Sequence, residues 1–183
     1  MSYLSNTMHL VFNILFILAF MDGTPLFDFN DKVSTEDWRV VNDGVMGGLS
    51  QGIFSINSEG HGFFRGNVSL ENYGGFSSVR YRFETKDTSK FSQIQIRLKG
   101  DGKPYQFRVK ADDRQRYSYI ANIKTSGDWE ILSIEFSEMY PAFRGRLLDL
   151  PNYSGIEMTE IAFLIGNKKE ENFALEIDYI ELL

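Results

Sequence analysis

Few residues in this sequence could carry out catalysis. There is no cysteine, and the two histidines are His9 and His61. The lack of cysteine excludes thiolate nucleophiles, thiolate zinc ligands and disulfide bonds. The segment GLSQG, residues 48–52, has G-x-S-x-G spacing, but strand-like residues and not a helix follow it, so it does not predict a serine nucleophile elbow. His61 lies in EGHGFF, which has a turn composition and no Asp or His spacing typical of a metal site, so we expect this histidine to be solvated.

Carboxylates offer little more. Five aspartates fall in expected turns, where aspartate commonly bonds its own backbone: Asp43, Asp101, Asp112, Asp113 and Asp128. None of them follows the Asp-x-Asp-x-Asp-Gly pattern of a calcium loop. The sequence therefore predicts a protein that is not an enzyme and that needs no metal or cofactor.

Basic and amide side chains recur at alternate positions in three expected strands, 76–85, 94–100 and 105–111. We take the members of this outward set as candidate binding residues: Arg80, Arg82, Gln95, Arg97, Lys99, Gln106, Arg108 and Lys110. Neighbouring strands lie only about 4.8 Å apart, so pairing would gather these side chains on one face.

The short turn GDGKP, residues 100–104, predicts that Arg97 and Arg108 lie close together on that face. Guanidinium and amide groups can bind a polyanion, a sugar or an acidic protein segment. The alternative interpretation is an ordinary solvated sheet surface. The net charge of −6 argues against nucleic acid as the partner, because binding to nucleic acid depends on a cationic surface.

The elements that must position these residues are strands. Apolar and polar residues alternate with a period of two in most segments after residue 25, and none of them shows a helical apolar stripe over ten residues. The 183 residues include 16 Phe, 9 Tyr and 2 Trp, which indicates one domain with an aromatic core. We predict a single all-β sandwich of jelly-roll type over residues 25–183, with one short helical turn near residues 137–143.

Residues 10–21, LVFNILFILAFM, are too few to span a bilayer but match the apolar part of a signal peptide. They predict an export leader over residues 1–24, cleaved between Ala19 and Pro25. The mature protein would then be periplasmic or secreted and would have no stable membrane span. The preceding residues lack Lys and Arg. The alternative is that these residues form a buried N-terminal strand or helix, or a membrane anchor. The protein would then be cytoplasmic or membrane-associated.

A glycine-rich segment, WRVVNDGVMGGLSQG, occupies residues 38–52. Its G-x-x-G-G spacing and the strand-like residues that follow do not match a dinucleotide-binding loop, which opens a helix. We expect a structural loop, in which Gly44, Gly47 or Gly48 adopts positive φ and Met46 or Trp38 packs beneath.

This segment resembles the signature of the complex I intermediate-associated protein 30 family, a Trp followed by Asp-x-Val-Met-Gly-Gly-x-Ser. The matching residues are Trp38, Asn42, Asp43, Gly44, Val45, Met46, Gly47, Gly48 and Ser50. The resemblance extends over residues 26–182 through the segments GGFSSVRYRF, LKGDGKPYQFRV, FRGR, IAFLIGNKK and FALEIDYIEL. It implies a galactose-binding-like β-sandwich.

Mitochondrial members of that family are assembly factors of respiratory complex I. The resemblance implies a non-enzymatic interaction protein that holds an assembly intermediate or another protein client, with complex I subunits as one such client. The sequence lacks the Arg-rich transit peptide of an imported mitochondrial protein, and export would separate it from the cytoplasmic arm of a bacterial complex I. The alternative function is an exported carbohydrate-binding module with a glycan partner.

Overall fold

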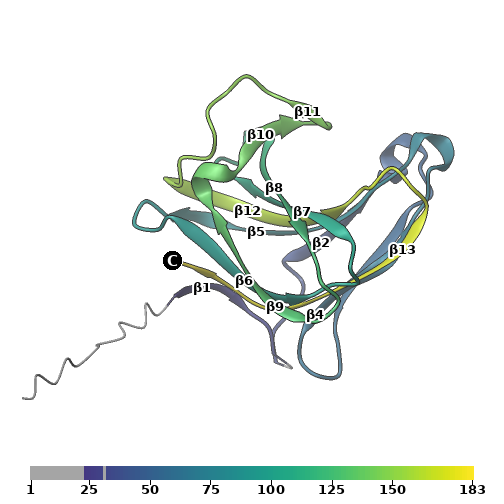
Figure 1. The fold of residues 1–183 in the computed structure, drawn as a ribbon, viewed down its shortest axis with the longest axis horizontal. Coiled ribbons are helices and arrows are strands. Elements are labelled where there is room, and N and C mark those ends of the chain that lie inside the picture. Colours follow the sequence, from purple (N-terminus) through teal and green to yellow (C-terminus); the bar gives the residue numbers. More distant parts are fainter. Residues whose placement is uncertain (1–22, 31) are drawn as a thin grey trace, which may run out of the picture.

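Two antiparallel sheets stack face to face in the computed structural model, which describes residues 23–30 and 32–183 (Figure 1). The all-β sandwich predicted from the alternation is confirmed. The helical segments in the described residues are three short 3-10 turns, η1 (Asp43–Met46), η2 (Glu71–Tyr73) and η3 (Phe136–Glu138). No helix in this part of the chain is long and apolar enough to cross a membrane. The expected leader falls almost entirely outside the described residues.

We name the two sheets A and B. Sheet A runs in the order β3 (Gln51–Ile56), β4 (Gly62–Val68), β13 (Glu171–Leu182), β6 (Gln93–Lys99) and β9 (Trp129–Glu135), and β1 (Thr24–Asp28) also pairs with β13. Sheet B runs in the order β11 (Arg146–Leu147), β10 (Tyr140–Phe143), β8 (Ser118–Lys124), β7 (Pro104–Lys110), β12 (Glu157–Ile165), β5 (Ser77–Asp87) and β2 (Trp38–Asn42).

The core lies between the sheets and is formed by alternate residues of the central strands. Ile94, Ile96 and Leu98 of β6 are fully buried, and so are Phe107 of β7 and Phe163 of β12. The side chains between these positions point away from the core, as expected for strands with one buried face. Alternation therefore sets which residues of each strand are available to a ligand.

The pairing expected between residues 94–100 and 105–111 is wrong. These segments are β6 and β7, and they belong to different sheets. Residues 100–103 do not close a hairpin; they carry the chain across one end of the sandwich. Arg97 and Arg108 consequently lie on the opposite outer surfaces of the molecule.

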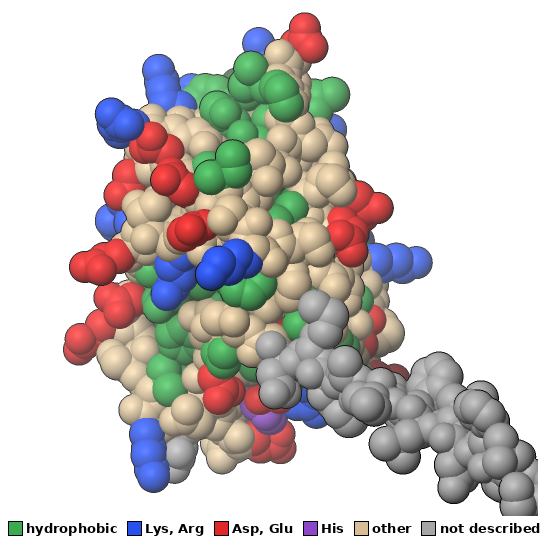
Figure 2. Space-filling model, turned by 90° about the vertical axis from the view of Figure 1, so that its left-hand side faces the viewer, with side chains coloured by type: hydrophobic (Ala, Val, Ile, Leu, Met, Phe, Trp, Pro, Cys, Tyr) green, Lys and Arg blue, Asp and Glu red, His purple; other side chains and the backbone are tan. Residues whose placement is uncertain are grey.

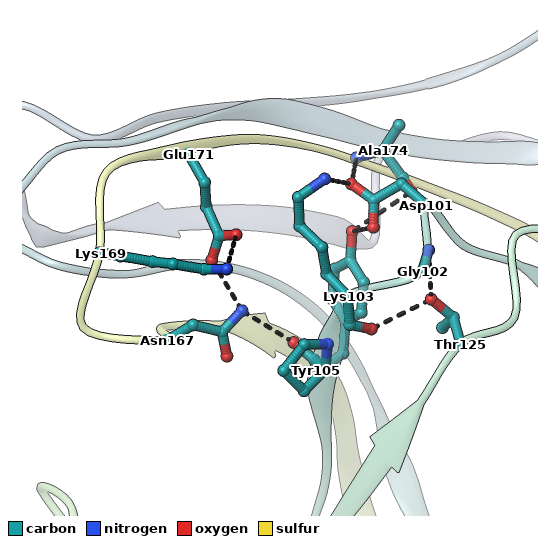
Figure 3. A network of polar contacts seen from close by, with 10 residues as sticks. Asp101, Gly102, Lys103, Tyr105, Thr125, Asn167, Lys169, Glu171 and Ala174 are labelled. Atoms are coloured by element: carbon teal, nitrogen blue, oxygen red, sulfur yellow. Dashed lines mark hydrogen bonds and ion pairs between the residues drawn. The ribbon is translucent and has the colours of Figure 1, made fainter.

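Asp101 holds this crossing in place (Figure 3). Its Oδ2 accepts the backbone N–H of Ala174 in β13 at 3.0 Å, and its Oδ1 accepts the hydroxyl of Tyr105 in β7 at 2.9 Å. Lys103 pairs with the same carboxylate at 2.6 Å. One side chain thus bonds to a strand of each sheet, which explains why a turn composition here does not produce a hairpin.

Candidate functional site

The glycine loop, residues 42–50, is organised around the carboxylate of Asp43, which is 3% exposed. Asp43 accepts the backbone N–H of Ser50 at 3.1 Å and the hydroxyl of Ser50 at 2.5 Å. It also accepts the N–H groups of Gly75 at 2.6 Å and Phe76 at 3.2 Å. Burial acts to raise the pKa of Asp43, but hydrogen bonds from Ser50 and the two backbone groups outweigh it and hold the pKa below its usual range.

The two adjacent glycines of the loop are needed for different reasons. Gly47 is the glycine with positive φ, at 85°, where it ends η1, whereas Gly44 and Gly48 are not in the left-handed region. At Gly48 a Cβ would come within 2.3 Å of the Asp43 carboxylate. The loop therefore requires one glycine for its backbone conformation and one for close approach to Asp43.

Trp38 and Asn42 connect the loop to both sheets. The Trp38 ring stacks on Phe54 of sheet A and on Tyr81 of sheet B, with ring centroids 5.0 Å apart in each case. Asn42 accepts the backbone N–H of Gly52 at 3.2 Å and the hydroxyl of Ser77 at 2.6 Å. Trp38 and Asn42 thus join the two sheets. The side chains of Val45 and Met46 lie outside the described part of the structure.

We expect Gly47→Val and Gly48→Val each to lower the free energy of unfolding by about 1 to 3 kcal/mol, measured by urea unfolding. A β-branched residue is strained at the positive φ of Gly47, and Val at Gly48 meets Asp43. Gly44→Val is the matched control, because a Cβ there has no neighbour within 4 Å. Equal stability of all three variants would contradict a structural loop.

The structure divides the eight candidate binding residues between two surfaces. Arg80 and Arg82 of β5 and Gln106, Arg108 and Lys110 of β7 share the outer surface of sheet B, on either side of β12. The other three, Gln95, Arg97 and Lys99 of β6, lie on the outer surface of sheet A. The single basic face expected from the sequence is therefore not formed, because β6 and β7 do not pair.

On sheet A the two basic candidate residues, Arg97 and Lys99, are already paired. Arg97 forms an ion pair with Asp178, and its guanidinium lies 4.6 Å from the centre of the Trp129 ring. Lys99 lies 3.4 Å from the Glu176 carboxylate. These partners satisfy Arg97 and Lys99, so neither of these two cations is free to pair with an acidic ligand.

Sheet B carries a cavity of about 440 Å³ on its outer surface. Figure 1 shows the sheet curling at β10 and β11. Residues of both strands line the cavity. Its lining comprises Gln106, Arg108, Ile120, Tyr140, Ala142, Gly145 and Leu147. Two of the candidate binding residues, Gln106 and Arg108, thus meet residues of three later strands and of the turn between β10 and β11.

Arg108 is the electrostatic centre of this cavity. Its Nε and Nη2 donate to Gln106 Oε1 at 3.1 and 2.5 Å, and no carboxylate of the described residues lies within 4.0 Å of it. Burial lowers the pKa of Arg108 to about 10, and the charge of Arg80 acts in the same direction. Arg80 and Arg82, by contrast, share the buried Glu160, at 3.9 and 3.1 Å.

A chain of hydrogen bonds extends from Arg108 along the cavity wall. Gln106 Nε2 donates to Asn122 Oδ1 at 3.4 Å, and Asn122 Nδ2 donates to the Tyr140 hydroxyl oxygen at 2.9 Å. The Tyr140 proton is left for another acceptor. The arrangement can bind a carboxylate at Arg108 and hydroxyl groups beside it. The lining residues contain no pair of a nucleophile and a base.

Sequence reasoning missed Ile120, Tyr140 and Leu147, because they come from strands whose position beside β7 was not predictable from spacing. The FRGR segment, residues 143–146, was a signal: it forms the turn between β10 and β11 at the edge of the cavity, with Arg144 and Gly145 at φ values of 50° and 76°.

The fold is a β-sandwich of the kind found in carbohydrate-binding modules. The family 11 carbohydrate-binding module of a Clostridium thermocellum cellulosomal cellulase superposes with a TM-score of 0.63 at 18% identity, over 88% of this chain and 94% of that chain. Part of the agarase AgWH50C superposes with a TM-score of 0.55 at 12% identity, over 87% of this chain and 24% of that chain. At these identities the likeness concerns the fold alone.

The chain belongs to the Complex I intermediate-associated protein 30 (CIA30) family, whose model matches residues 27–177. The mitochondrial protein of that name from Mus musculus is 25% identical, over 87% of this chain and 59% of its own length. The Drosophila melanogaster protein is also 25% identical, over 91% of this chain and 65% of its own length. The chain thus spans less than two thirds of the relatives it matches.

Proposed function

We propose that this protein is a non-enzymatic binding protein that holds a protein client through the cavity of sheet B, in the manner of an assembly factor. The observation that carries the proposal is Arg108, a half-buried guanidinium that lies near Arg80 and has no carboxylate partner among the described residues. An Asp or Glu side chain of a client would supply that partner with two parallel hydrogen bonds. The names of the mouse and fly relatives support intermediates of complex I as the client class.

A second candidate function is binding of a glycan in the same cavity. The chain of amide and hydroxyl groups formed by Gln106, Asn122 and Tyr140 favours it, since these groups can both donate to and accept from sugar hydroxyls. The sandwich fold is compatible with this function but does not specify it. Export through the expected leader would favour a glycan, whereas retention inside the cell would favour a complex I client.

Replacing Arg108 tests both candidates. We expect Arg108→Gln to reduce capture of the native protein partner at least tenfold in quantitative cross-linking, because it leaves a client carboxylate unpaired. Arg82→Gln is the matched control on the same surface, since this side chain is 59% exposed and pairs with Glu160. Capture by wild-type protein should weaken as the salt concentration rises past about 0.15 M.

Glycan binding would be selected by two results together. Binding of a glycan polymer to the wild type would not change with salt concentration, and Asn122→Ala would lose that binding. If a folded Arg108→Gln variant captured both the protein client and the glycan as well as the wild type does, this cavity would not be the binding site.

A further inference from the structure

A second polar cluster lies on the outer surface of sheet A, on the opposite side of the sandwich from the cavity. The turn between β3 and β4 brings Glu59 and His61 next to Glu176 of β13. One ligand atom from each of the three residues lies within 4.8 Å of the other two. In Figure 2 the histidine of the described residues, in purple, lies against acidic side chains in red. His61 is therefore not the isolated, solvated residue that its turn composition suggests.

Asn57 fixes the geometry of all three residues. Its Oδ1 accepts the backbone N–H groups of Glu59 at 3.0 Å and of His61 at 2.9 Å. Its Nδ2 donates to Glu176 Oε2 at 2.8 Å. The turn is closed further by the backbone N–H of Asn57, which donates to the carbonyl of His61 at 2.9 Å. A single side chain thus holds both ends of the turn against β13, so the cluster is arranged before any ligand arrives.

The Nδ1 atom of His61 has no hydrogen-bond partner among the described residues although it is buried. Such atoms are rare in folded proteins and call for an explanation. Glu59 Oε2 lies 3.7 Å from it, too far for a hydrogen bond. Two ligand atoms that each lie about 2.1 Å from a tetrahedral metal ion are about 3.4 Å apart. The observed separation is therefore close to that of two ligands of one ion.

The remaining neighbours of His61 support its ring from the other sides. Nε2 faces Asp178 Oδ1 at 3.8 Å, which is beyond hydrogen-bond distance but on the side where metal-bound imidazoles commonly meet a carboxylate. The ring packs edge-on against Trp129, with centroids 4.5 Å apart. Asp178 is itself paired with Arg97. Lys99 is the competing cation, 3.4 Å from Glu176 Oε1, and its side chain is 41% exposed and can turn into solvent.

We propose that His61 Nδ1, Glu59 and Glu176 form a binding site for a divalent transition-metal ion, with Zn²⁺ as the ion that fits best. One imidazole and two carboxylates suit Zn²⁺, whereas Mg²⁺ and Ca²⁺ prefer oxygen ligands only. Water completes the coordination. The bound ion links the turn between β3 and β4 to the central strand β13. This site is independent of the function proposed for sheet B.

Calorimetric titration of the untagged, chelator-treated full chain with Zn²⁺ tests the site. We expect His61→Gln and Glu59→Gln each to weaken Zn²⁺ binding at least tenfold. Lys99→Gln should tighten it severalfold, because it removes the cation that competes for Glu176. His9→Gln is the matched control, since it removes the chain's other histidine. Mg²⁺ should bind much more weakly than Zn²⁺.

The Glu59 side chain is 70% exposed, so Glu59→Gln keeps the test decisive even if His61→Gln fails to fold. Co²⁺ in the site should also quench the fluorescence of Trp129, and Trp129→Phe should abolish that quenching. Zn²⁺ affinity within twofold of the wild type in folded Glu59→Gln, or weaker binding by Lys99→Gln, would overturn the proposal.

Discussion

Asp43→Ala is expected to lower the free energy of unfolding by about 3 to 5 kcal/mol. The substitution removes a buried carboxylate that accepts four hydrogen bonds. The Ser50 hydroxyl and three backbone N–H groups then lose their acceptor. Each buried donor left unsatisfied costs about 1 to 3 kcal/mol, part of which is recovered by relaxation and water. Urea unfolding followed by circular dichroism measures the difference.

The pH dependence of this loss identifies the carboxylate as its cause. The folded state holds the pKa of Asp43 below its unfolded value, so the carboxylate stabilises the fold at neutral pH. That contribution is lost as the pH falls through the folded pKa. The difference in stability between wild type and Asp43→Asn should therefore be largest near neutral pH and shrink below about pH 4. A difference that is constant from pH 7 to pH 3 would contradict this explanation.

Trp38→Ala is the second large effect that we expect, again a loss of about 3 to 5 kcal/mol in the free energy of unfolding. Trp38 is 6% exposed and packs against aromatic rings of both sheets, so its removal leaves a cavity between them. Thermal unfolding followed by circular dichroism measures the loss.

Two variants serve as controls for this prediction. Trp38→Phe should cost clearly less than Trp38→Ala, because Trp38 Nε1 makes no hydrogen bond to the described residues and the ring is largely retained. Trp129→Ala, on the outer surface of sheet A, should cost only about 1 kcal/mol. If Trp38→Ala were no more harmful than Trp129→Ala, the ring would not hold the sheets together.

The sequence was sufficient to predict the sandwich, because alternation determines which side chains of each strand are buried. It was not sufficient to predict which strands are neighbours. GDGKP has the composition of a hairpin turn, and the bond from Asp101 to Ala174 that makes it a crossing between sheets joins residues far apart in the chain. Local spacing carries no information about such a partner.

The candidate site was predictable to the same extent. Gln106 and Arg108 were identified from their outward phase on one strand, and both line the cavity. Tyr140 was missed because its place depends on the position of β10 beside β8. His61 was misjudged for a related reason: its carboxylate neighbour Glu176 comes from β13, more than a hundred residues later. A metal-ligand pattern of this kind exists in the fold and not in the sequence spacing.

The order of strands also determines when this chain can fold during its synthesis. The central strand of each sheet is made last: β12 pairs with both β5 and β7, and β13 pairs with both β4 and β6. A ribosome must therefore release more than 150 residues before either sheet can close. Until then the earlier strands present unpaired apolar edges, which are prone to aggregate. The earlier strands thus cannot bury these edges until β12 and β13 have left the ribosome.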